Sequence, residues 1–148
     1  SPPGGSGWEV SATVVSTRSG NTTLMRPSTN DENAYVHNNI VHATAGGDRL
    51  AIMDDTGAVD LQNNWLTDGW SQSHSGSPDG TIDASGNLTG SAPGFVELDG
   101  ADFSLDSGSS AVGASGALQS PAFAPDCQYQ QHTTGIERAS ADDLGAVE

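Results

Sequence analysis

The sequence predicts an all-β protein built as a parallel β-solenoid, in which short strands stack coil upon coil. Four similar hexapeptides recur along the 148 residues at spacings of 26, 25 and 23 residues, and such a period is typical of solenoids. Turn-forming residues separate the hexapeptides, and the chain contains 19 glycines. No long window places apolar residues three and four apart, as an amphipathic helix requires.

The hexapeptides share one pattern: apolar, polar, polar or small, Asn or Thr, then two mostly apolar residues. They cover residues 10–15, 36–41, 61–66 and 84–89. Neighbouring coils of a parallel solenoid lie about 4.8 Å apart, so equivalent residues form columns. We therefore expect the fifth positions to stack inside the solenoid: Val14, Ile40, Trp65 and Leu88.

A second series of short segments lies midway between the hexapeptides. Residues 23–26 read Thr-Leu-Met-Arg and residues 51–54 read Ala-Ile-Met-Asp, which places Met25 and Met53 28 residues apart. The second series predicts another strand on each coil.

An asparagine recurs at one position of the repeat, as Asn39, Asn64 and Asn87. Its side-chain amide can bond to neighbouring coils, and Asn tolerates the left-handed backbone of a tight corner. We interpret these residues as a structural ladder at a corner and not as a ligand site.

The repeats and the closing segments resemble one known group. Residues 36–66 look like the last complete coils of secreted right-handed parallel β-helix proteins, the pectate-lyase-like superfamily. Three segments resemble the C-terminal block of that group: residues 93–96 (Pro-Gly-Phe-Val), 102–105 (Asp-Phe-Ser-Leu) and 107–112. A fourth segment, residues 143–148 (Asp-Leu-Gly-Ala-Val-Glu), resembles the ending of that group.

The resemblance implies a right-handed parallel β-helix of about three to four coils with an irregular C-terminal segment. It implies the C-terminal portion of a longer secreted protein, as a fragment or as a separate subunit. Ser110 and Gly113 replace the usual Pro and Asp of the group, which predicts a looser last turn. We expect a flexible linker or processed end over residues 1–7, coils over 8–92 and the C-terminal block over 93–148.

The charge of the chain excludes two classes of partner. There are 19 acidic residues against four basic ones, all of them Arg, for a formal net charge of −15. Nucleic acids and anionic membrane surfaces both require cations that this chain lacks. No run approaches the ~20 apolar residues of a membrane span, so we expect no membrane insertion. The single cysteine, Cys127, allows no internal disulfide.

Catalytic residues are hard to find. Lyases of the superfamily use a Lys or Arg base, and the chain has no Lys. Arg18, Arg26 and Arg49 remain, but an Arg base needs a strongly lowered pKa, which nothing in the sequence indicates. The adjacent Asp54 and Asp55 precede Thr-Gly and are interpreted as a turn. The residues favour a non-catalytic chain, and enzymatic activity stays open.

Two binding sites are predicted from residue type alone. Residues 79–87 alternate oxygen donors with glycines, so Asp79 and Asp83 form a candidate structural Ca²⁺ site, which Asp54 and Asp55 on adjacent turns could join. No other cofactor is expected. Trp70 and Tyr129 are candidates for carbohydrate contact, because an exposed ring can stack on a sugar.

These observations predict a non-catalytic structural or binding part of an extracellular β-helix protein, secreted or at the cell surface. Its expected partners are another β-helix polypeptide or copies of itself, because an uncovered end of a solenoid invites pairing. Polysaccharide is a further candidate partner. The alternative is a polysaccharide lyase or hydrolase acting on extracellular polysaccharide.

Overall fold

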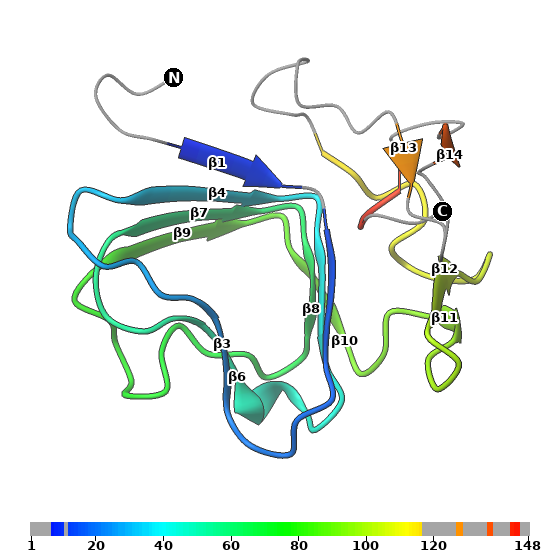
Figure 1. The fold of residues 1–148 in the computed structure, drawn as a ribbon, viewed down its shortest axis with the longest axis horizontal. Helices are drawn as coiled ribbons and strands as arrows, with labels where there is room; N and C mark the ends of the chain where they lie inside the picture. Colours follow the sequence, from blue (N-terminus) through cyan, green and yellow to red (C-terminus); the bar gives the residue numbers. More distant parts are fainter. Residues whose placement is uncertain (1–6, 11, 117–126, 129–135, 138–142, 146–148) are drawn as a thin grey trace.

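A computed structural model describes residues 7–10, 12–116, 127–128, 136–137 and 143–145. It confirms the predicted fold class: the chain forms a parallel β-solenoid of about three turns. Figure 1 looks nearly along the stack, so that the coils overlie one another around a common interior. No helix within the described residues has the length and apolar character needed to cross a membrane.

Two walls of the solenoid are four-stranded parallel sheets. The first wall has the order β1–β4–β7–β9 and the second has the order β10–β8–β5–β2. The strands of the first wall are β1 (Gly7–Val10), β4 (Asn33–His37), β7 (Ala58–Gln62) and β9 (Thr81–Ser85). Those of the second wall are β2 (Thr13–Ser16), β5 (Ile40–Ala43), β8 (Trp65–Thr67) and β10 (Leu88–Gly90).

The third side of the solenoid is shorter. Strand β3 (Thr22–Met25) pairs in parallel with β6 (Leu50–Met53), which follows the 3₁₀ turn η1 (Gly47–Arg49). Met25 pairs with Met53, which confirms the second repeat series. The next coil continues this side through a parallel bridge between Ala51 and Ser71.

The register confirms the hexapeptide repeat in the last three coils. Val36, Leu61 and Ala84 are paired across the first wall, and Ile40, Trp65 and Leu88 are paired across the second. The first coil departs from this register. Val10 pairs with Val36, but Thr13 pairs with Ile40, so the corner between β1 and β2 is one residue shorter.

The prediction that Val14, Ile40, Trp65 and Leu88 stack inside therefore holds for Val14 and is wrong for Ile40, Trp65 and Leu88. Val14 pairs with Val41 and shares its column with Leu66, and this column faces the interior core. Ile40 and Trp65 point the opposite way. A shift of one residue moves a side chain to the other face of a strand. Because this wall is covered on both faces, its strands are apolar on both, and the alternation that would fix the faces is lost.

The interior core is formed by the inward columns of all three sides. Its largest fully buried members include Ile52, Met53, Leu61 and Leu66, and Trp70 and Ile82 pack against it as partly buried residues. Apolar burial of this kind is the main stabilising contribution to the fold.

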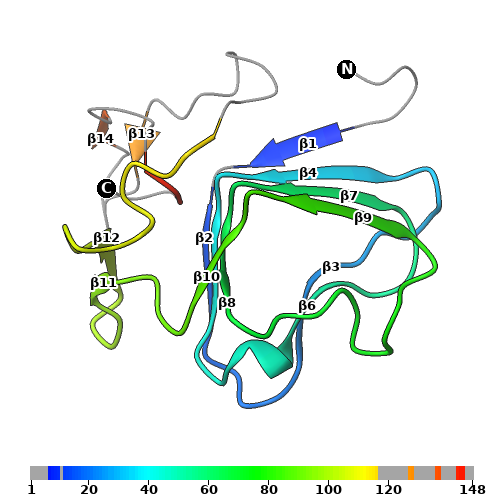
Figure 2. The ribbon, with the colours of Figure 1, turned by 180° about the vertical axis from the view of Figure 1, so that it is seen from behind.

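A second core lies outside the second wall. It joins Ile40 and Trp65 to Ala111 and Leu144 of the C-terminal block, with Phe95, Leu105 and Ala114 packed around them. The block contains the antiparallel pairs β11 (Phe95–Glu97) with β12 (Asp102–Leu105) and β13 (Cys127–Gln128) with β14 (Ile136–Glu137). Figures 1 and 2 show β11 and β12 beside this wall, outside the coils.

The Asp-Leu-Gly segment of residues 143–145 fastens the block to the coils. Asp143 Oδ1 accepts a hydrogen bond of 2.6 Å from the Gly113 N–H, and the Gly145 N–H donates to Asn38 O at 2.9 Å. Gly145 has φ +83°, and a Cβ there would lie 2.5 Å from Thr13 Oγ1 and 3.0 Å from Ile40 Cδ1. Only glycine satisfies both conditions.

Shortening Leu144 should separate the block from the wall. Leu144 is fully buried, so Leu144→Ala is expected to lower the free energy of unfolding by about 2–4 kcal/mol, as other buried Leu truncations do. Chemical denaturation followed by tryptophan fluorescence measures this loss. Val112→Ala is the control, because Val112 is 42% exposed and should change stability by less than about 0.5 kcal/mol. Equal effects of the two substitutions would contradict the packing described above.

His42 lies between the second wall and the block. It is buried, with its ring edge-on to Trp65 and Phe95 at centroid distances of 5.9 and 6.2 Å. Its Nδ1 lies 3.2 Å from Thr67 Oγ1, which already accepts the Ala43 N–H at 2.9 Å. The Thr67 hydroxyl is able to donate to Nδ1 of a neutral imidazole while its oxygen accepts the Ala43 N–H. Burial lowers the pKa of His42 from its ordinary value.

The lowered pKa of His42 predicts acid sensitivity. As the pH falls below about 6.5, the unfolded chain protonates this imidazole and the folded protein resists, so the unfolded state binds more protons and stability falls. His42→Gln stays neutral and should lose part of this dependence. Free energies of unfolding measured at several pH values between about 7.5 and 5.5 would show a shallower slope for the variant. If the free energy of unfolding depended on pH with the same slope in His42→Gln and in the wild type, the lowered pKa of His42 would be contradicted.

Candidate functional site

The first described coil has strand edges that no other described strand pairs. Among the described strands, β1, β2 and β3 each pair on one side only, with β4, β5 and β6. The opposite edge of each strand carries backbone N–H and C=O groups that no described strand pairs. Such edges are templates for another strand.

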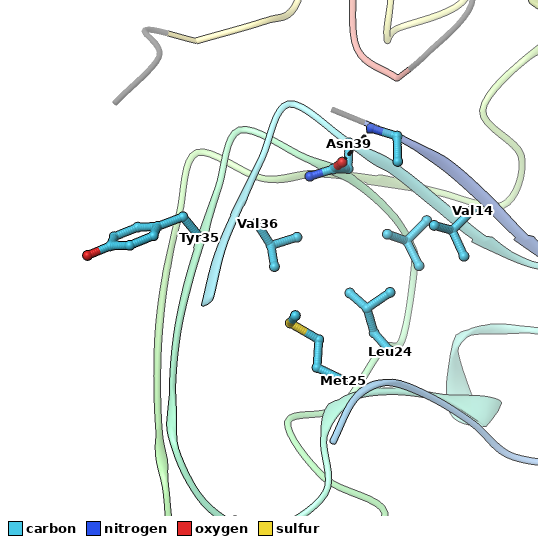
Figure 3. A pocket seen from close by; sticks show the side chains of 8 residues that line it. Val14, Leu24, Met25, Tyr35, Val36 and Asn39 are labelled. Carbon is cyan, nitrogen blue, oxygen red and sulfur yellow. Dashed lines mark hydrogen bonds between the residues drawn. The ribbon is translucent and has the colours of Figure 1, made fainter. Parts of the chain in front are cut away.

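An apolar pocket opens at the same end of the stack. Val14, Leu24, Met25, Val36 and Val41 line a half-open hollow of about 150 Å³, together with Ala12, Tyr35 and Asn39. Figure 3 shows Leu24, Met25 and Val36 pointing into the hollow, whereas the ring of Tyr35 points away from it. The hollow is the top of the interior core.

Exposure along one inward column shows why this end differs from the middle of the stack. Val41 and Leu66 are 2% and 0% exposed, because each has a coil on both sides, whereas Val14 is 36% exposed. The same apolar residue type thus lies in the core in one coil and at an uncovered surface in the first. We define Val14, Leu24, Met25, Val36 and Val41, with the edges of β1–β3 that no described strand pairs, as the open end.

The open end is poor in carboxylates. Residues 10–30 contain no Asp or Glu, although the chain has 19. Two of the chain's four basic residues lie within residues 10–30. Arg18 is exposed, and Arg26 Nη1 lies 3.1 Å from Asp54 Oδ2. In the neighbouring coil, Arg49 donates to Asn21 Oδ1 at 3.4 Å.

The predicted asparagines form a column at the corner between the two large walls. Asn39 donates from its backbone and side-chain nitrogens to Asn64 Oδ1 at 2.9 and 3.1 Å. Asn64 repeats the same pair of bonds to Asn87 Oδ1 at 3.0 and 2.9 Å. The second hydrogen of each Nδ2 is donated to a backbone carbonyl. Asn64 Nδ2, for example, donates to Val36 O at 2.7 Å. At the first coil the column ends, because Ala12 supplies only its backbone N–H to Asn39 Oδ1.

The left-handed backbone of the corner lies one residue before the asparagine column. Asn38, Asn63 and Gly86 have φ values of 59°, 54° and 65°. The prediction that Asn39, Asn64 and Asn87 form the amide ladder is confirmed, and the prediction that they also adopt the left-handed turn is wrong. The residue before each of them adopts that turn instead.

The other end of the stack has a different chemistry. Its last coil presents Ala84 and Thr89 on the inward side, both exposed, with Ile82 partly buried. Asp79 and Asp83 flank this end, and Leu88 is 36% exposed on the outward side. The two ends therefore differ in both apolar content and charge.

The four residues of the calcium prediction are not gathered in one place. Asp54 bonds to Arg26 and to Thr23 Oγ1, whereas Asp83 pairs in register with Asp60 on β7. Asp55 and Asp79 do share a polar hollow of about 380 Å³, with Asn30, Thr56 and Thr81 on its walls. Within the described residues, no three His, Cys, Asp or Glu side chains are placed to hold a metal ion. Calcium binding by Asp79, Asp83, Asp54 and Asp55 stays a prediction, and of these four Asp55 and Asp79 lie on one hollow.

The remaining predicted residues are scattered. Trp70 is partly buried against the interior core, so only part of its ring is available to a sugar. Tyr129 lies outside the described residues. Cys127 lies in β13 of the C-terminal block.

Sequence reasoning missed two features of the structure. The open end was not assigned to residues, although the apolar positions of the first repeat could have indicated it. The second feature is a contact between buried His37 and Asp60, in which His37 Nε2 lies 3.3 Å from Asp60 Oδ1. His37 precedes the corner, and only the register shows that Asp60 on the next coil lies near it.

No protein-family model, curated protein or solved structure was found to match this chain.

Removing the amide of Asn64 should destabilise the whole stack. Asn64→Ala leaves the buried Asn39 N–H and Val36 C=O without their bonds, at an expected loss of about 2–4 kcal/mol in the free energy of unfolding. Asn63→Gly is the control, because glycine accepts φ 54° and should change stability by less than about 1 kcal/mol. Urea titrations of both variants test the ladder, and equal stability of Asn64→Ala and the wild type would contradict it.

Proposed function

We propose that this chain is a non-catalytic association module of an extracellular parallel β-helix protein of the pectate-lyase-like superfamily. Its open end docks on further β-coils, which belong either to another β-helix polypeptide or to copies of itself. The superfamily part of the proposal rests on the resemblance of residues 93–112 and 143–148 to the closing block of that group.

The single observation that carries the proposal is the exposed apolar top of the interior core. Val14 is 36% exposed directly above the buried Val41, beside a hollow of about 150 Å³. Water in contact with this surface is released when another coil covers it, which favours association. On the same side of the stack, β1, β2 and β3 are edge strands among the described strands, and an edge strand is a template for a further strand.

The acidic character of the chain supports an extracellular setting. A net charge of −15 keeps a protein soluble and apart from other anions. It also disfavours direct binding of an anionic polysaccharide, unless cations bridge the two. Docking through a surface with few carboxylates is compatible with this charge.

Association through the open end predicts a dye-binding surface that disappears on docking. The hydrophobic dye ANS should bind the undocked protein. The ANS fluorescence per chain should fall as the concentration of the chain or of a docking β-helix partner rises. Sedimentation velocity at the same concentrations follows the size of the complex. Val14→Glu is the control, because it makes the end polar and should remove the dye signal.

A monomer at every concentration whose ANS fluorescence equals that of Val14→Glu would overturn the proposal. Product formation from pectate or alginate in the presence of Ca²⁺ would instead support the enzymatic alternative. Neither outcome is expected.

A further inference from the structure

We propose that Asn21 is an N-glycosylation site, to which an oligosaccharide is attached while the chain is exported. Asn87 has the same acceptor motif but serves the fold instead. This inference rests on the extracellular location in the proposed function, because N-linked glycans occur on secreted proteins. It does not require the open end to dock.

The acceptor motif is Asn-X-Ser/Thr, in which X is any residue except Pro. Two of the eight asparagines of the chain fit it: residues 21–23 read Asn-Thr-Thr, and residues 87–89 read Asn-Leu-Thr. A glycan is bulky and polar, so it needs an amide that faces solvent. The surroundings of the two asparagines differ in this respect.

Asn21 lies in the connection from β2 on the second wall to β3 on the third side (Figures 1 and 2). It is exposed, and so are residues 17–20 before it. A Cβ placed on Gly20 would have no described atom within 4 Å apart from those of its chain neighbours. The space beside this turn is therefore open to solvent.

The nitrogen of the Asn21 amide is the atom that a sugar would use. Asn21 Oδ1 accepts a hydrogen bond of 3.4 Å from Arg49 Nη1 on the next coil, and the Arg49 side chain is itself 49% exposed. This bond uses the amide oxygen, whereas an N-linked sugar attaches to Nδ2. The turn can therefore carry a glycan and keep its contact with Arg49.

Asn87 is held in the amide ladder. Its Oδ1 accepts from the backbone and side-chain nitrogens of Asn64 at 3.0 and 2.9 Å, and its Nδ2 donates to Leu61 O at 2.8 Å. Turning the amide to free Nδ2 for a sugar would leave the donors of buried Asn64 without their acceptor, which is costly. A glycan at Asn87 is thus incompatible with the folded corner.

Attachment of the glycan forms one bond and breaks one. Asn21 Nδ2 bonds to the anomeric carbon of the sugar, and the bond from that carbon to the diphosphate of a lipid-linked oligosaccharide breaks. The amide nitrogen gives one proton to a base of the transferring enzyme, and the lipid diphosphate leaves. No oxidant or reductant is needed.

Export of the chain behind a secretory leader from a glycosylating eukaryotic cell tests the site. Enzymatic release of an N-linked glycan converts the modified Asn to Asp, and peptide mass spectrometry locates the change. We expect conversion at Asn21 and none at Asn87, with loss of the mass of one glycan from the intact chain.

Substitutions of the hydroxyl residues separate the two motifs without changing either asparagine. Thr23→Val removes the first motif and keeps the β-branched shape on β3, so the glycan should be lost. Thr23→Ser keeps both the motif and the hydroxyl that donates to Asp54 Oδ1 at 3.1 Å, and it should restore the glycan. Thr89→Ala is the matched control, because it removes only the second motif and should leave the glycan in place.

An unmodified Asn21 in the exported chain, once its circular dichroism shows the wild-type fold, would overturn the inference. A glycan on Asn87 of the folded chain, or one that persists in Thr23→Val, would overturn it as well. The proposed function is tested separately, because ANS binding and sedimentation velocity of the enzymatically deglycosylated chain report on docking alone. Docking without a glycan would leave the proposed function standing, and a glycan without docking would leave only the present inference.

Discussion

The column of buried side-chain amides at one corner is the constraint on which the rest of the molecule depends. Asn39, Asn64 and Asn87 bond to one another and to the backbone of adjacent coils. Each amide fixes the register of two coils, because a shift by one residue would leave its oxygen and nitrogen without partners in a buried place. The walls on either side of the corner inherit this register, and the inward columns of apolar residues stack because of it.

The second wall separates two cores and therefore has two apolar faces. Its inward column, Val14–Val41–Leu66, belongs to the solenoid, and its outward pair, Ile40 and Trp65, belongs to the contact with the C-terminal block. The first wall carries Tyr35, Asp60 and Asp83 on its outward side. The difference follows from the block, which covers one wall and leaves the other to solvent among the described residues.

Sequence reasoning predicted the solenoid, the register of the last three coils and the asparagine column, because these features repeat. It failed where a feature occurs once. The connection from β1 to β2 is one residue shorter than the next corner, so Val14 pairs with Val41 and not with Ile40. The outward direction of Ile40 and Trp65 depends on a segment far along the chain, which no local pattern contains. The carboxylates of the calcium prediction were chosen by residue type, and the folding of the coils places Asp54 beside Arg26 instead.

The bond from Gly145 to Asn38 has a consequence for how the molecule folds. A simple solenoid is held by contacts between successive coils, so it can add or lose coils one at a time from either end. Here residues 143–145 return from beyond the last coil to the corner of the second one. The outer core over Ile40 is completed only when this late segment arrives, and closing such a long loop is slow. The return segment thus converts a linear array into a closed unit, whose coils are expected to unfold together.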